Sequence, residues 1–225
     1  RAAKFGNSYS QFIYALLVKK DRIETDYFKL AADAGIPEAE YDFGVMLAEG
    51  ISVARDRYLA ALYFKSSADK GNAKAQLNIG MMHAEGKYAP KNDREAVRYF
   101  MMSASQGNPK AQLNMGLMWM NGRGVRRNEN EAMKYYKMAA DQGDPQAMYN
   151  LGIMMSKGRG NMRNDSVAAR YFKKAADSGL VKAMFSMGLA LLEGKGVPQN
   201  QGEASHYFKI AADNGNSDAM GYCAS

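Results

Sequence analysis

The apolar and small residues of this chain recur with helical spacing. Within the stretch EAMKYYKMAAD (131–141) they fall at i, i+3, i+4, i+7 and i+8, as Ala132, Tyr135, Tyr136, Ala139 and Ala140. This spacing places them on one face of an α-helix and leaves charged residues on the other. The pattern therefore predicts a helix whose apolar face must be buried against another part of the protein.

The same pattern returns every 36 residues without an insertion. One glycine column shows the period most directly: Gly35, Gly71, Gly107, Gly143, Gly179 and Gly215. Each period predicts two helices, which we call helix A (about 109–120 in one period) and helix B (starting at Asn128 and including 131–141 in the same period). One helical hairpin cannot bury its own apolar face, so neighbouring hairpins must cover it. The sequence thus predicts an all-α solenoid of stacked αα-hairpins.

Start and stop signals frame both helices. Prolines open helix A at Pro37, Pro109 and Pro145, where a missing N–H costs nothing. Good N-cap residues precede helix B: Asp56, Asn92, Asn128, Asn164 and Asn200. A glutamate three residues later predicts a capping box in three repeats: Glu95, Glu131 and Glu203. The Gly107 column is expected to end helix B with a positive φ.

Two further columns predict contacts between helices. Glycines recur inside helix A, where each costs about 1 kcal/mol relative to alanine: Gly44, Gly80, Gly116, Gly152 and Gly188. We expect another backbone or an aromatic ring from the Tyr135 column to pack there. Aspartates recur near the end of helix B: Asp33, Asp69, Asp141, Asp177 and Asp213. We expect each carboxylate to accept N–H bonds from the start of the next helix A.

These columns resemble one repeat family. "AMYNLGIMMSKGRG" (147–160) followed by "AARYFKKAADSG" (168–179) is similar to the Sel-one-like repeat (SLR), a branch of the tetratricopeptide-like (TPR-like) repeats. The resemblance covers residues 27–225 and implies a right-handed, TPR-like superhelix of 36-residue repeats. Residues 1–26 fit poorly and are expected to form a degenerate repeat or an N-terminal cap. The chain ends inside a helix A, so we expect it to be a segment of a longer protein.

The resemblance implies a non-catalytic adaptor that assembles other proteins. Members of the family are associated with ubiquitin ligases of endoplasmic-reticulum quality control, with signalling regulators and with bacterial host-interaction factors. The chain has two histidines and one cysteine, far apart in sequence, which predicts no metal site. The glycine-rich basic loop NGRGVRRNENE (121–131) recurs in other periods, so it indicates a repeat connector rather than a phosphate site. No enzyme and no cofactor are expected.

A partner-binding face is predicted on helix A, which lines the concave surface of TPR-like solenoids. A polar column runs through its middle: Asp42, Asn78, Asn114, Asn150 and Ser186. An asparagine there can bond a peptide backbone through both donor and acceptor, or can bond the neighbouring repeat instead. An apolar column lies beside it: Met81, Leu117, Ile153 and Leu189. Trp119, the single tryptophan, would be either an exposed anchor or a core residue.

Cations gather in the loops between helices A and B. The net charge is +7, and the loop cations are expected on one edge, which we call the basic edge: Lys87, Lys91, Arg123, Arg126, Arg127, Arg159, Arg163 and Lys195. This edge is either simply solvated or contacts an acidic partner segment or a membrane surface. An RNA-binding helical-repeat protein is the alternative function. RNA readers vary the residue that reads each base, whereas the polar column here is nearly uniform, so nucleic acid is disfavoured.

The compartment is left open by the sequence. Cys223 is the single cysteine, so no internal disulfide can form, and this is compatible with the cytoplasm. The family resemblance also allows the lumen of the endoplasmic reticulum. The longest apolar stretch, 183–192, is shorter than the roughly 20 residues of a membrane-spanning helix. No membrane span is therefore expected in this segment.

Overall fold

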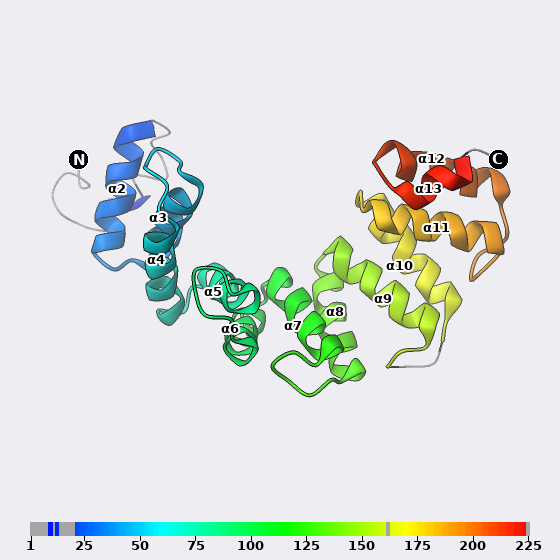
Figure 1. The fold of residues 1–225 in the computed structure, drawn as a ribbon, viewed down its shortest axis with the longest axis horizontal. Coiled ribbons are helices and arrows are strands. Elements are labelled where there is room, and N and C mark those ends of the chain that lie inside the picture. Colours follow the sequence, from blue (N-terminus) through cyan, green and yellow to red (C-terminus); the bar gives the residue numbers. More distant parts are fainter. Residues whose placement is uncertain (1–8, 11, 14–20, 161–162, 224–225) are drawn as a thin grey trace. The chain divides into compact units, whose positions relative to one another are not determined.

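The computed structural model describes residues 9–10, 12–13, 21–160 and 163–223, and of residues 21–24 and 223 it describes the backbone only. Helices B are α2 (Asp21–Asp33), α4 (Arg57–Asp69), α6 (Asp93–Ser105), α8 (Glu129–Asp141), α10 (Asp165–Asp177) and α12 (Gln201–Asp213). Helices A are α3 (Pro37–Glu49), α5 (Ala73–Glu85), α7 (Pro109–Asn121), α9 (Pro145–Lys157), α11 (Val181–Glu193) and α13 (Ser217–Cys223). Figure 1 shows their alternation along the chain. The predicted all-α hairpin solenoid with 36-residue repeats is confirmed.

The chain divides into two compact units, residues 1–111 and residues 112–225, each described by itself. We call them the N-terminal and C-terminal units. Successive helices pack against one another from α2 to α6 in the N-terminal unit and from α8 to α13 in the C-terminal unit, as α4 does against α3 and α5. Alanines at the contacts are completely buried, which lets the helices approach closely. Most of residues 1–20 lie outside the described part, so their assignment to a degenerate repeat or cap stays a prediction. Within the described ranges, no helix has the length and apolar character needed to cross a membrane.

The predicted N-caps of helix B are confirmed, but the capping box is only half formed. The Asn92 side chain accepts from the N–H of Glu95 at 3.1 Å, as expected. The N–H of Asn92 itself donates to the carbonyl oxygen of His83 at 2.9 Å, and the Glu95 carboxylate pairs with Arg98. Asn128 and Asn200 likewise donate to Trp119 and Leu191. The N-cap backbone therefore ties the start of helix B to the last turns of helix A.

The glycines at the end of helix B behave as predicted. Their φ values lie between 85° and 100°, the left-handed region that closes a helix. The N–H of Gly107, for example, donates to the carbonyl oxygen of Ala104 at 3.0 Å. The chain then turns directly into the next helix A, which keeps the period constant.

An aromatic ring does pack on each helix A glycine, but it comes from the column after the predicted one. A Cβ built on Gly80 would lie 2.5 Å from the Phe100 ring, whereas the expected Tyr99 lies one residue earlier. The other pairs are Gly44–Phe64, Gly116–Tyr136, Gly152–Phe172 and Gly188–Phe208. These rings are buried. Glycine is retained inside helix A because any side chain would collide with the ring that joins the two helices of the hairpin.

The expectation for the aspartate column is wrong. The N–H groups at the start of the next helix A are capped by Asn72, Asn108, Asp144 and Asn216. Asp33 accepts instead from Lys29 Nζ at 2.7 Å and from Tyr63 Oη at 2.7 Å. Asp69 accepts in the same way from Lys65 and from Tyr99. In the N-terminal unit the carboxylates thus join successive helices B through a tyrosine hydroxyl.

Gly80→Ala is predicted to destabilise the protein. The new methyl group would overlap the buried Phe100 ring, and overpacking costs about 1–3 kcal/mol. This cost exceeds the helix-propensity gain of about 1 kcal/mol. The midpoint of thermal unfolding, followed by circular dichroism, should therefore fall. Gly202→Ala is the matched control, because its nearest atom is 3.7 Å away; an equal fall for both variants would contradict the packing account.

Tyr63→Phe is predicted to remove about 0.5–1 kcal/mol of stability in a pH-dependent manner. The bonds from Lys29 and Tyr63 lower the pKa of Asp33 below 3.8, so their stabilisation is full above 3.8 and lost as the pH falls further. Burial and the bond to Asp33 raise the pKa of Tyr63 from 10.0 to about 12. Its contribution is therefore full below pH 10 and is lost as the pH rises through 12.

Thermal unfolding midpoints of the wild type and Tyr63→Phe, measured across the pH range, test this prediction. The difference should be largest at neutral pH and shrink at both extremes. Tyr171→Phe is the control, because in the described structure the carboxylate of Asp141, one repeat earlier, is bonded to Lys137 but not to the Tyr171 hydroxyl, whereas that of Asp33 is bonded to both Lys29 and Tyr63. A Tyr63→Phe difference that is the same at every pH would show that the hydroxyl–carboxylate bond is not its source.

Candidate functional site

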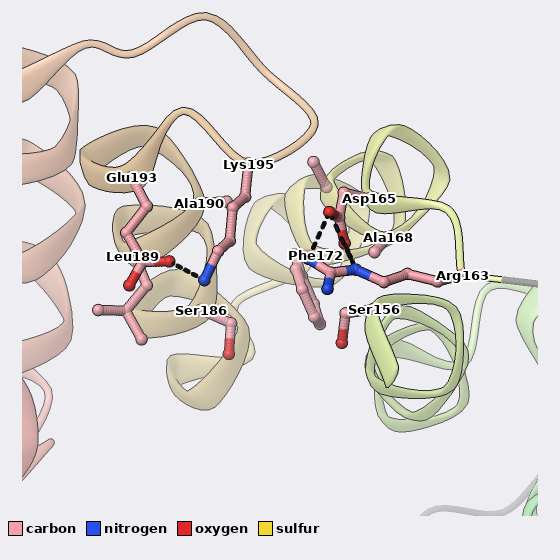
Figure 2. A pocket seen from close by; sticks show the side chains of 11 residues that line it. Ser156, Arg163, Asp165, Ala168, Phe172, Ser186, Leu189, Ala190, Glu193 and Lys195 are labelled. Carbon is pink, nitrogen blue, oxygen red and sulfur yellow. Dashed lines mark hydrogen bonds and ion pairs between the residues drawn. The ribbon is translucent and has the colours of Figure 1, made fainter. Parts of the chain in front are cut away.

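A pocket of about 300 Å³ lies between successive hairpins of the C-terminal unit. Its apolar wall includes Phe172 of α10 and Leu189 of α11, and hydroxyl groups enter from Ser156 of α9 and Ser186 of α11. Figure 2 shows these side chains around the space, with charged side chains above them. Because the Phe172 ring also packs on Gly152, the hairpin contact itself forms part of the pocket.

Two ion pairs hold the charged side chains of this pocket. The Arg163 guanidinium donates to the Asp165 carboxylate at 2.7 and 3.0 Å. Lys195 pairs with Glu193 at 2.5 Å. The bond from Arg163 lowers the pKa of Asp165 and raises that of Arg163. The pocket is therefore polar at its rim but balanced in charge, as the dashed lines of Figure 2 show.

The N-terminal unit has a pocket of about 350 Å³ at the equivalent repeat position. Five of its lining residues precede those of the first pocket by 108, which is three periods of 36: Ala48, Arg57, Ala60, Met82 and Lys87 match Ser156, Asp165, Ala168, Ala190 and Lys195. Tyr88 also lines this pocket, at the repeat position of Gly196. The pocket is thus a property of stacked hairpins. The side chains differ at two decisive positions, where Arg57 replaces a carboxylate and Tyr88 replaces a glycine.

The residues predicted to bind a partner lie on helices A. In the N-terminal unit α5 carries Asn78, which is half-buried, and Met81, which is 41% exposed. In the C-terminal unit Leu117 is 37% exposed, Asn114 and Asn150 are half-buried, and so is Ile153. Each apolar residue lies three positions after an asparagine, so the two types share a helical face.

The Asn150 amide is only partly bonded. Its Oδ1 accepts from Gln146 Nε2 at 3.1 Å, and its Nδ2 is buried without a partner among the described residues. An amide with one unused donor is a polar group that a ligand can complete. The binding role of this column stays a prediction.

Trp119 is half-buried on α7, where it packs against a core cluster that includes Tyr136 and Leu151. Its indole Nε1 is buried without a partner in the described structure. This placement is that of a packing side chain with one unused donor. It corresponds to the core alternative rather than to an exposed anchor.

Nearby carboxylates pair with at least half of the basic edge. All of its residues are exposed except Arg123, which is half-buried. Among the described residues, at least four of its eight cations form ion pairs: Lys87–Glu85, Arg127–Glu129, Arg163–Asp165 and Lys195–Glu193. Each pair is separated by two residues, so the signal was present in the sequence. Lys91, Arg126 and Arg159 remain as exposed cations without a carboxylate partner in the described part of the chain.

The histidines and carboxylates of the described residues have structural surroundings. In the described residues, no three His, Cys, Asp or Glu side chains form a group that could hold a metal ion. His83 stacks on Tyr99 and shares a hydrogen bond with the Pro90 carbonyl oxygen, as a structural histidine does. Apolar pockets, exposed helix A side chains and half-buried amides suit the recognition of a peptide chain.

Known proteins give a consistent picture. The chain is similar to c5321, a protective antigen of uropathogenic Escherichia coli strains with an SLR fold, at 31% identity, covering 99% of this chain and 49% of that one, with a TM-score of 0.91. It is similar to a Sel1 repeat protein from Oxalobacter formigenes at 28% identity, covering 98% and 66%, with a TM-score of 0.85. The chain thus spans between half and two thirds of these two structures. No curated protein matches it in sequence.

Similarity to pilF of Pseudomonas aeruginosa, at 14% identity with 100% and 99% coverage and a TM-score of 0.69, concerns the fold alone.

The Sel1 repeat model matches five consecutive segments: residues 37–72, 73–108, 109–144, 145–180 and 181–216. These segments follow the period found in the sequence and confirm the resemblance drawn from it. The chain therefore belongs to the Sel1 repeat family.

Proposed function

We propose that this chain is a non-catalytic scaffold that binds peptide segments of partner proteins along its helices A. Sel1 repeat proteins are generally protein-interaction scaffolds, and their fold is typically non-catalytic. The observation that supports the site most directly is the exposure of Met81 and Leu117, at the same position of two repeats. Exposed apolar side chains beside amides provide both burial and hydrogen bonds for a bound peptide.

The half-buried asparagines would recognise the peptide backbone. An amide offers both a donor and an acceptor, so one side chain can bond the N–H and the C=O of the same peptide residue. The unused Nδ2 of Asn150 would gain a bond if its side chain turned outward toward a ligand. Recognition of backbone groups at a repeated position favours an extended peptide over a compact partner surface.

The basic edge would add selectivity for acidic segments through Lys91, Arg126 and Arg159. Surface charges of this kind raise the rate of association more than the affinity. RNA binding remains the alternative function. Four edge cations would have to leave their carboxylates to bind phosphate, which argues against it.

Replacement of the exposed apolar residues by Met81→Ser and Leu117→Ser is predicted to abolish partner binding. The folded state should change by less than about 0.5 kcal/mol, because both side chains are exposed. Affinity purification followed by mass spectrometry should show partners that are retained by the wild type and lost by this double variant. The Asn78/Asn114/Asn150→Ala variant should lose the same partners.

Arg126→Ala with Arg159→Ala is the matched control for the edge. A contrary outcome is that both helix A variants retain partners that the Arg126/Arg159 variant loses. That result would show that the binding site lies on the loops and not on helices A. Single-stranded RNA bound at about 50 mM salt and released steeply as salt rises would favour the alternative function.

The fluorescence of Trp119, the single tryptophan, is predicted to be that of a packed indole. Its emission should be shifted to the blue of free tryptophan and poorly quenched by iodide, because the indole packs against the α8–α9 core. Addition of a partner purified as above should leave the emission maximum unchanged. Emission like that of the free amino acid would instead return Trp119 to the binding surface.

A further inference from the structure

Tyr88 occupies a loop position that disfavours it. Its φ is 62°, in the left-handed region, and the equivalent residues of later repeats are Gly124, Gly160 and Gly196 with φ between 68° and 76°. A bulky side chain is uncommon in this conformation, whereas glycine adopts it freely. This repeat therefore carries an aromatic ring where its own backbone would be more stable without one.

The ring of Tyr88 organises its surroundings. Arg57 Nη1 donates to Tyr88 Oη at 2.7 Å, and the guanidinium lies 5.6 Å from the ring centroid. The Tyr58 ring meets Tyr88 edge-on, with centroids 5.9 Å apart and planes at 90°. Favourable aromatic and cation–π geometry thus holds Tyr88 in place.

The surrounding surface is apolar and exposed. Tyr58 is 76% exposed and Leu62, one turn further along α4, is 67% exposed. The later repeats place polar or small residues at these two positions: Arg94 and Arg98, Asn130 and Lys134, Ser166 and Arg170, Gly202 and His206. The patch is therefore a property of this repeat and not of the solenoid. Clustered exposed apolar side chains of this kind mark interaction sites.

A pocket of about 350 Å³ opens within the patch, lined by Tyr58, Leu62, Ile79, Met82 and Tyr88. It is large enough for a bulky apolar side chain. Tyr88 also lines the inter-hairpin pocket that contains Arg57 and Lys87. One tyrosine thus borders an apolar pocket and a charged one.

One charge of the second pocket is reversed relative to later repeats. Arg57 stands where three later repeats have Asp93, Glu129 and Asp165, and Asp165 pairs with Arg163 in the C-terminal unit. Arg55, the equivalent of Arg163, donates instead to the Ala48 carbonyl oxygen at 3.0 Å. Glu49 lines the pocket but pairs with neither arginine in the described structure. The pocket therefore presents the Arg57 guanidinium without a carboxylate partner.

We propose that the surface formed by Arg57, Tyr58, Leu62 and Tyr88, the Tyr88 patch, binds an acidic peptide segment of a partner protein. A bulky apolar side chain of that segment enters the pocket between Tyr58 and Tyr88. A carboxylate next to that side chain pairs with the Arg57 guanidinium. The peptide thereby supplies the negative charge that later repeats carry at the position of Arg57. The Tyr88 patch does not include the helix A residues Asn78 and Met81 that are proposed above to bind a partner, so this proposal does not depend on them.

Two substitutions test the proposal by restoring the residues of later repeats. Tyr88→Gly places glycine at a positive φ, and Arg57→Asp restores a carboxylate beside Arg55, so both variants should unfold at the wild-type temperature or above. A random peptide library displayed on phage is selected on the wild-type chain. Enriched peptides, synthesised with a fluorescent label, should contain a carboxylate next to a bulky apolar residue. Either variant should weaken their binding at least tenfold.

Matched controls isolate the patch. Arg170→Asp makes the same charge change as Arg57→Asp at an exposed helix B position of the C-terminal unit and should bind these peptides as the wild type does. So should the Asn78/Asn114/Asn150→Ala variant, which separates this proposal from the helix A site. Enriched peptides that lack carboxylates, that bind Tyr88→Gly equally well, or that do not emerge at all would overturn the proposal. Self-association of the wild type that Tyr88→Gly abolishes, measured by sedimentation, would make a second copy the occupant and overturn it as well.

Discussion

In five repeats an aromatic ring lies directly against the backbone of a helix A glycine, and the rest of the structure depends on this contact. The ring fills the space that a side chain on helix A would occupy. The two helices of a hairpin therefore pack at the same position along their axes in each of these repeats. Helix A gives up about 1 kcal/mol of propensity at each such glycine. The buried ring offsets this cost, because an aromatic side chain removes a large apolar area from water.

Because the two helices of each hairpin pack in the same way, the spaces between successive hairpins are equivalent. The pockets of the two units consist of residues three periods apart, although one is balanced in charge and the other is not. Side chains at the rim can therefore vary without disturbing the contact below them. A repeat that departs from its neighbours, as at Arg57 and Tyr88, thus adds a binding surface of its own to the one that the repeated helix A positions provide.

The period, the helix ends and the glycine contact could be predicted from the sequence because each depends on residues close together along the chain. For the ring that packs on Gly80, the sequence favours Tyr99 over Phe100. Both residues are aromatic and adjacent, and helical spacing alone does not separate them. The bond between Asp33 and Tyr63 joins residues 30 apart, so only the packing of α2 and α4 reveals it. The loop ion pairs join residues two positions apart, so the sequence contains them. A column of cations alone does not reveal them, because the paired carboxylates lie in other columns. The burial of Trp119 depends on its contacts with residues of α8 and α9. The periodic pattern does not show which side chains make these contacts.

The constant period also bears on how such a chain can change over evolutionary time. The glycines after helices B share one geometry, and the residues before α3, α5, α9 and α11 share one extended backbone conformation although their side chains differ, so these junctions between repeats are interchangeable. Recombination that removes or duplicates 36 codons would rejoin the chain in register at any of them. The number of repeats can therefore drift while the hairpin contact is kept, and a single repeat that has acquired its own binding residues can be copied or moved as a cassette.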